Sequence, residues 1–235
     1  MSIAENIALV REGIARAARS VGRDPAEITL LGASKMNDAA ACRAAIAAGI
    51  DALGENRVQE MTQKLSEHAY DGVPLHFIGH LQRNKVRQVV GKVALIHSVG
   101  SEALLRAIDA QAEALGLVQD ILLEVNIGGE ESKSGFSPEA LRPAAEIARE
   151  LAHVRVRGLM CIPPVSQEEH GSAPYFEKVR ALFVDISENL YDNRLNIVSM
   201  GMSGDYEDAV RAGATLVRVG TTIFGARSYP AAQQP

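Results

Sequence analysis

A single lysine, Lys35, follows a short apolar segment and precedes a helix-capping residue. Residues 28–33 are almost wholly apolar, which predicts a strand covered on both faces, and Asn37 or Asp38 can cap the alanine-rich segment that follows. Lys35 therefore falls at the carboxyl end of a strand, the edge at which α/β folds bind ligands. A lysine amine removed from water there can attack an aldehyde. The alternative is a lysine that reaches into solvent.

Two later segments combine glycines with hydroxyl side chains at the start of predicted helices. One is Ser-Met-Gly-Met-Ser-Gly-Asp at 199–205, and the other is Arg-Val-Gly-Thr-Thr at 218–222. Small residues expose backbone N–H groups at helix amino termini, which is how many proteins hold a phosphate. Each segment alone is typical of an ordinary turn. Two of them in adjacent strand-to-helix loops of a barrel favour a phosphate site.

The positions of these segments depend on a repeating α/β pattern. An amphipathic helix is predicted over 3–20, ahead of the repeat. Strands are predicted at 28–33, 50–54, 75–79, 93–97, 120–126, 154–160, 195–199 and 215–219. Helices are predicted at 39–48, 57–68, 82–90, 101–115, 175–190 and 206–212, with one more beginning at Pro138 and a short one after Thr221.

About eight strands alternating with helices are typical of a single (β/α)8 TIM barrel. The second possibility is a doubly wound open sheet. We expect one domain over residues 1–235, with a leading helical segment at 1–24 and a frayed end at 229–235.

In a barrel all strand ends share one face. The residues expected there are Lys35, Asn56, His80, Ser98, Asn126, Met160, Met200 and Gly220. Because the first and eighth strands close a barrel, Lys35 is expected beside the two candidate phosphate loops. An aldehyde that carries a phosphate fits this arrangement, and pyridoxal 5'-phosphate is one. Lys35 would form the imine, the loops at Ser203 and at Gly220 and Thr221 would take the phosphate, and Arg218 would bond the pyridine nitrogen.

Composition narrows the classes of partner. Hydrophobic residues make up 47% of the 235 residues and the net charge is -5, so neither nucleic acid nor an anionic membrane is expected to bind. Cys42 and Cys161 match no metal or redox spacing and indicate reduced thiols in a cytoplasmic protein. We expect no signal peptide, no membrane span and no metal site, although His76 and His80 are four residues apart.

Six segments in order carry a resemblance that covers nearly the whole chain. They are Ala-Ser-Lys at 33–35, Gly-Glu-Asn at 54–56, His-Phe-Ile-Gly-His-Leu-Gln-Arg-Asn-Lys at 76–85, His-Ser-Val at 97–99, the segment 199–205, and Arg-Val-Gly-Thr at 218–221. This set resembles the pyridoxal-phosphate homeostasis protein family. The resemblance implies a barrel similar to the amino-terminal domain of alanine racemase. It also implies a Schiff-base lysine and a cofactor site made of Lys35, Asn56, Met202, Ser203, Arg218, Gly220 and Thr221.

One departure from the family pattern follows the lysine. The family often has Lys-Thr-Lys-Pro there, whereas this chain has Lys-Met-Asn-Asp at 35–38. A second amine is missing, so transfer of the cofactor through it is in question. Lys133 is either an accessory amine at the mouth of the site or a solvated loop charge.

Cofactor binding does not by itself predict turnover. An arginine at the pyridine nitrogen leaves that nitrogen unprotonated, which weakens the cofactor as an electron sink. We also expect no second domain after residue 235 to supply a base. We therefore expect a monomeric binding protein with little or no turnover. The resemblance implies a role in vitamin B6 and amino-acid balance, with cofactor-dependent apoenzymes as partners.

Two enzymatic alternatives remain open. An amino-acid racemase would need a base, for which Tyr206 and Cys161 are the strand-end candidates. A lysine-imine aldolase acting on a sugar phosphate would need a general acid, for which Glu55 is the candidate.

Overall fold

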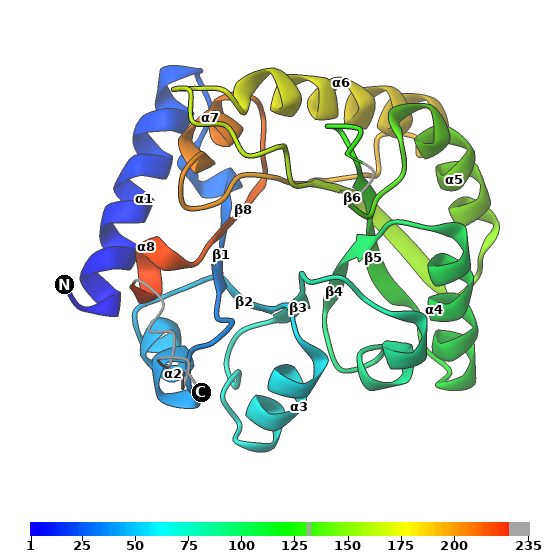
Figure 1. Ribbon diagram of the computed structural model, residues 1–235, viewed down its shortest axis with the longest axis horizontal. Helices are drawn as coiled ribbons and strands as arrows, with labels where there is room; N and C mark the ends of the chain where they lie inside the picture. Colours follow the sequence, from blue (N-terminus) through cyan, green and yellow to red (C-terminus); the bar gives the residue numbers. More distant parts are fainter. Residues whose placement is uncertain (131–132, 226–235) are drawn as a thin grey trace, which may run out of the picture.

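The strands form a closed parallel barrel in a computed structural model that describes residues 1–130 and 133–225. Each strand pairs with the next in sequence, and β8 pairs with β1 (Figure 1). The strands are β1 (Thr29–Ala33), β2 (Ala52–Glu55), β3 (Leu75–Phe77), β4 (Leu95–Val99), β5 (Gln119–Val125), β6 (Val154–Cys161), β7 (Ile197–Ser199) and β8 (Leu216–Val219). The predicted barrel is confirmed, and the open sheet is wrong because β8 returns to β1.

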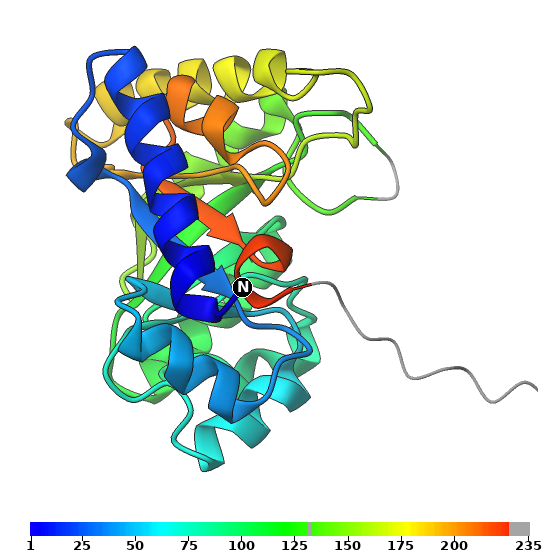
Figure 2. The same cartoon turned by 90° about the vertical axis from the view of Figure 1, so that its left-hand side faces the viewer.

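Helices surround the barrel, and the first of them comes before the first strand in the sequence. They are α1 (Ile3–Ser20), α2 (Ala39–Ala47), α3 (Val58–Ser66), α4 (Glu102–Ala114), α5 (Pro138–Glu150), α6 (Ala173–Leu190), α7 (Tyr206–Arg211) and α8 (Thr221–Phe224), with 3-10 turns η1 (Pro25–Glu27) and η2 (Arg83–Gln88). Helix α1 runs along the outside of the barrel and contacts α2, α7 and α8 (Figure 2). In the described part of the chain, no helix combines the length and apolar character needed to cross a membrane.

Side-chain caps begin several of these helices as the sequence indicates. Asp38 accepts a hydrogen bond from Ala41 N at 2.8 Å, and Ser101 caps α4 in the same way. Ser137 caps α5, whose first residue is Pro138. Each cap satisfies a backbone N–H that has no partner inside the helix, and so fixes where the helix starts.

Several element boundaries differ from the prediction. The segment 82–90 forms the short 3-10 turn η2 rather than an α-helix, and it stops before Gly91, whose φ is +78°. Strands β2, β4 and β7 each begin two residues later than expected. The expected first residues are buried in the outer layer before the ladder begins, namely Ile50, Val93 and Leu195. Their apolar character therefore reports burial and not strand pairing. The predicted frayed end at 229–235 lies outside the described residues.

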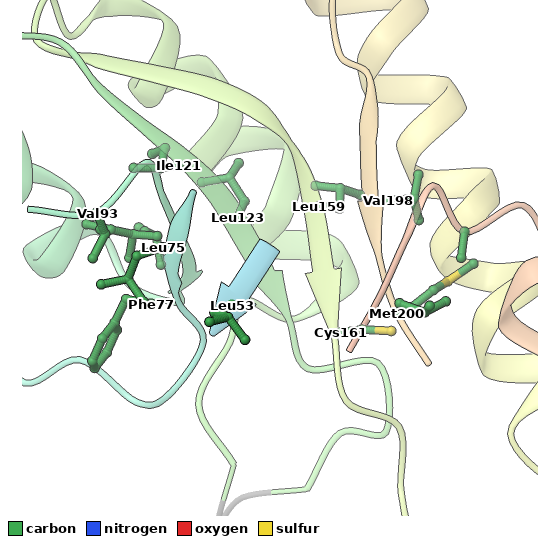
Figure 3. Packing of buried hydrophobic residues seen from close by; sticks show 14 of the residues in the cluster. Leu53, Leu75, Phe77, Val93, Ile121, Leu123, Leu159, Cys161, Val198 and Met200 are labelled. Carbon is green, nitrogen blue, oxygen red and sulfur yellow. The ribbon is translucent and has the colours of Figure 1, made fainter. Parts of the chain in front are cut away.

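The core has two layers, because alternate residues of each strand face opposite sides. The outer layer packs strands against helices, and Figure 3 shows part of it, with Leu53, Leu123 and Leu159 on three different strands. The inner layer fills the barrel with two small apolar clusters. One contains Leu31, Ala52 and Leu216, and the other contains Leu95, Leu122 and Met160.

Candidate functional site

Two adjoining hollows open at the carboxyl end of the barrel. The larger encloses about 490 Å³ and the smaller about 260 Å³. Both are lined by Ala33, Lys35, Met202 and Arg218. Because they share these residues, the two hollows form one continuous site with Lys35 at their junction.

The structure brings most of the predicted strand-end residues to this site. Those that line the larger hollow are Lys35, Asn56, His80, Ser98 and Asn126, and Gly220 lines the smaller one. Met160 and Met200 are the two exceptions. Met160 lies deeper in the barrel with Leu95, and Met200 packs in the outer layer. Met200 follows the inward-facing Ser199, so strand alternation turns its side chain toward the helices.

The smaller hollow contains the predicted phosphate loops. Ser203, Gly220 and Thr221 line it. Ser203 Oγ accepts hydrogen bonds from the backbone N–H groups of Gly220 at 3.2 Å and Thr222 at 3.4 Å. The two N–H groups thus converge on one oxygen, which is the arrangement that an anionic oxygen would meet. A Cβ on Gly220 would lie only 3.3 Å from the carbonyl oxygen of Ala33.

Arg218 is the buried cation of the site. It is 4% exposed and lies on the inner face of β8, where it is level with Leu31 of β1. Its guanidinium donates to Ser199 Oγ at 2.5 Å and to the carbonyl oxygen of Cys161 at 2.9 Å. Burial lowers the pKa of Arg218, but an arginine remains a donor at any physiological pH.

A hydrogen-bonded chain continues below Arg218 into the barrel. His97 Nδ1 is 3.0 Å from Ser199 Oγ, and His97 Nε2 is 3.0 Å from His76 Nδ1. Burial lowers the pKa of both rings, that of His76 to about 4, so both are neutral at pH 7. His76 thus pairs with His97 and not with His80, which lines the hollow above.

The turn that carries Lys35 has an unusual backbone. Asn37 N donates to Ser34 O at 3.1 Å, and the Asn37 side chain donates to Lys35 O at 3.0 Å. Met36 has φ of +62°, a conformation that side chains disfavour. Lys35 therefore projects from a closed turn and not from an extended strand.

The carboxyl group beside the site is Glu124, not Glu55. Glu55 is the last residue of β2 and points away from the barrel axis, where Ser34, Lys64 and Tyr70 donate to it. The sequence-based aldolase hypothesis therefore loses its general acid. Glu124 lines the larger hollow and accepts from Ser134 Oγ at 3.0 Å, and burial raises its pKa. The sequence contained one signal for Glu124. Asp120, Leu122 and Glu124 are two residues apart on β5, so their side chains share one face of the strand.

The two candidate bases for a racemase lie outside both hollows. Cys161 packs in the outer layer, and burial raises the pKa of its thiol to about 12. Tyr206 packs against α1, where a Cβ on Gly13 would lie 2.2 Å from its hydroxyl oxygen. Lys133, in contrast, lines the larger hollow, with its amine bonded to Glu130 and to Pro163 O.

Asn56 presents an acceptor with no partner. Among residues 1–130 and 133–225, nothing donates to its buried Oδ1, which belongs to a residue that lines the larger hollow. A buried polar atom of this kind costs free energy unless something bonds it. The site is thus suited to a ligand with a donor or with a bridging water.

Comparisons with known proteins place this chain in a family. The protein-family model described as alanine racemase, N-terminal domain, matches residues 28–228, a span that holds all eight strands. The chain is therefore a barrel protein of the alanine racemase N-terminal domain class. The pyridoxal phosphate homeostasis protein of Aquifex aeolicus is 42% identical over 97% of this chain and 100% of its own length. That of Pseudomonas aeruginosa is 42% identical over 98% of this chain and 98% of its own. The chain belongs to the pyridoxal phosphate homeostasis protein family.

A solved relative supports the same assignment. The structure of PipY from Synechococcus elongatus with PLP bound is 35% identical, has a TM-score of 0.83, and covers 95% of this chain and 100% of that chain. The resemblance recognised in the sequence is thereby confirmed.

Proposed function

We propose that this chain binds pyridoxal 5'-phosphate covalently through Lys35 and acts in the homeostasis of that cofactor. The observation that carries the proposal is that Lys35 and Arg218 line both hollows. A reactive amine thus lies between a cavity wide enough for a ring and a loop pair with convergent N–H groups. The relatives named for this role, and PipY with its bound PLP, support the same conclusion.

The residues present fit this cofactor. Lys35 would hold the aldehyde carbon, and the loops at Ser203, Gly220 and Thr221 would hold the phosphate. Arg218 would donate to the ring nitrogen, while Asn56 and Met202 line the ring cavity. When bound, the cofactor supplies a ring that can accept electron density from an attached amine.

We propose that turnover is slight or absent. Arg218 is fixed as a donor, which leaves the ring nitrogen unprotonated and limits its use as an electron sink. Neither Cys161 nor Tyr206 lines a hollow. A monomeric chain of one domain, a cytoplasmic location and service to cofactor-dependent apoenzymes complete the proposal. The cytoplasmic location is supported by the two buried free thiols, Cys42 and Cys161.

The experiment is an absorbance titration with pyridoxal 5'-phosphate, followed by borohydride reduction and peptide mass analysis. We expect the reduced cofactor on the peptide that contains Lys35, and none in Lys35→Ala. Lys92→Ala, a change at an exposed lysine outside both hollows, serves as the matched control. No uptake by the natural chain, or attachment at another lysine, overturns the proposal. Sustained racemisation of L-alanine by the loaded protein would favour the racemase alternative.

A further inference from the structure

A buried lysine ties α3 to the turn that carries Lys35. Lys64 is 4% exposed, and its ammonium donates to Ser34 O at 2.8 Å, to Glu55 Oε1 at 2.6 Å and to Glu60 Oε1 at 2.8 Å. An ammonium has three N–H groups, so three acceptors use all of them. Lys64 therefore joins the turn after β1, the end of β2 and its own helix at one point.

The two carboxylates of this group each hold one neighbour of Lys35. Glu55 Oε1 accepts from Ser34 Oγ at 2.6 Å. Glu60 Oε1 accepts from the backbone N–H of Met36. Residues on both sides of Lys35 are thus fixed by side chains that do not themselves line either hollow.

The turn needs such support because its backbone is costly. The left-handed φ of Met36 is energetically unfavourable for a residue with a side chain. A strained residue keeps its conformation only where the surroundings fix it. The bonds to Ser34 and Met36 supply that constraint.

Stability alone does not account for burying these charges. Burial raises the pKa of Glu55, and its second oxygen has no partner in the described part of the chain. Burial also opposes the charge on Lys64, but bonds to Glu55 and Glu60 outweigh it and raise the pKa of Lys64. A buried ion pair is often no more stable than apolar residues of equal volume. The role that its geometry supports is to hold the turn.

We infer that Glu55, Glu60 and Lys64 are positioning residues that direct Lys35 toward the aldehyde of the cofactor. The inference rests on the proposed function, since it concerns how Lys35 captures that aldehyde. Misplacing a reacting group slows its reaction strongly when the partner is held elsewhere. The same misplacement has little effect on the reaction rate when the reaction partner is small and diffuses freely.

Glu60 gives the most direct test, because its side chain is 20% exposed and its replacement need not unfold the chain. Glu60→Ala removes the acceptor for Met36 N, whereas Glu60→Gln keeps an oxygen there. Glu102→Ala is the matched control, since Glu102 is also in the first turn of a helix and pairs with a residue four positions on, Arg106. In each variant we would measure uptake of pyridoxal 5'-phosphate and reductive methylation of Lys35 by formaldehyde.

For Glu60→Ala we expect cofactor uptake to slow by about tenfold or more, with methylation of Lys35 changed by less than about threefold. Glu60→Gln should restore most of the uptake rate, and Glu102→Ala should match the natural chain. Equal uptake rates in Glu60→Ala and the natural chain overturn the inference alone. Absence of uptake in the natural chain overturns the proposed function instead, and the inference with it. A double change, Glu55→Gln with Lys64→Met, removes both buried charges together and should reproduce the effect of Glu60→Ala.

Discussion

Arg218 on β8 donates to Ser199 on β7 at 2.5 Å, across the inner faces of neighbouring strands. The contact fixes a buried guanidinium from below, while Arg218 itself lines both hollows above. Ser199 is itself completely buried and leads on to His97 and His76. The direction of Arg218 therefore depends on a polar chain that crosses the interior of the barrel.

Ser199→Ala should loosen Arg218 without removing its charge. One of its two protein acceptors is lost, and hydrogen bonds to charged groups contribute about 1.5–3 kcal/mol, so we expect affinity for pyridoxal 5'-phosphate to fall by about tenfold. The absorbance maximum of the bound cofactor should also shift. Ser187→Ala, at a buried serine of α6, is the control. Affinity and spectrum equal to those of the natural chain would contradict a contact between Arg218 and the ring.

Acid should destabilise the fold through His76. Its pKa is about 4 when folded and about 6.5 when unfolded, so the unfolded chain binds more protons between these values and stability falls as the pH drops through this window. At about pH 5 the loss from His76 amounts to about 2 kcal/mol. Urea unfolding at about pH 7.5 and about pH 5 measures it, with His76→Gln as the comparison. The variant should lose less stability than the natural chain, and parallel losses would contradict a neutral buried His76.

Gly220→Ala should weaken recognition of the phosphate more than recognition of the ring. The new Cβ would press on Ala33 at 3.3 Å and displace the loop that lines the smaller hollow. We expect the preference for pyridoxal 5'-phosphate over pyridoxal to fall, as measured by uptake of each. Gly204→Ala should have a smaller effect, because a Cβ at Gly204 meets nothing within 4 Å in the same hollow. An unchanged preference in Gly220→Ala would place the phosphate elsewhere.

Met36→Val should destabilise the turn beside Lys35. A β-branched side chain tolerates positive φ poorly, so we expect a loss of about 1–2 kcal/mol in the free energy of unfolding and slower cofactor uptake. Met36→Gly, which accepts that φ, should cost little stability. Urea unfolding of both variants gives the comparison. If Val is tolerated as well as Gly, the turn is not strained.

The barrel and its site face follow from the sequence for a simple reason. Apolar segments alternate with capped helices, and parallel strands joined by helices all end on one face, so Lys35, Asn56 and Gly220 could be placed there before their neighbours were known. The residues that begin several helices, such as Asp38 and Ser137, cap them through local hydrogen bonds and can therefore be recognised in the local sequence.

It was harder to predict whether each strand residue faces the interior of the barrel or the surrounding helices. Strands buried on both faces are apolar throughout, and a shift of one residue exchanges the two faces. This is why Met200 was expected in the site and Glu124 was missed. Glu55 was expected beside Lys35 in the site, but its side chain lies on the outer side of the barrel, where it bonds Ser34 and Lys64. The contacts of Ser199 and Lys64 join distant segments, and no local pattern reports them.

Closure of the barrel by β1 and β8 has a consequence for the growing chain. Lys35 belongs to the first strand, and Arg218 and Gly220 belong to the last, so the two halves of the site come together only when the sheet has joined its own beginning. A chain that still lacks its eighth strand has the Lys35 amine but not the loop at Gly220 and Thr221 that would hold the phosphate. Capture of the cofactor at Lys35 should therefore follow closure of the barrel and not precede it.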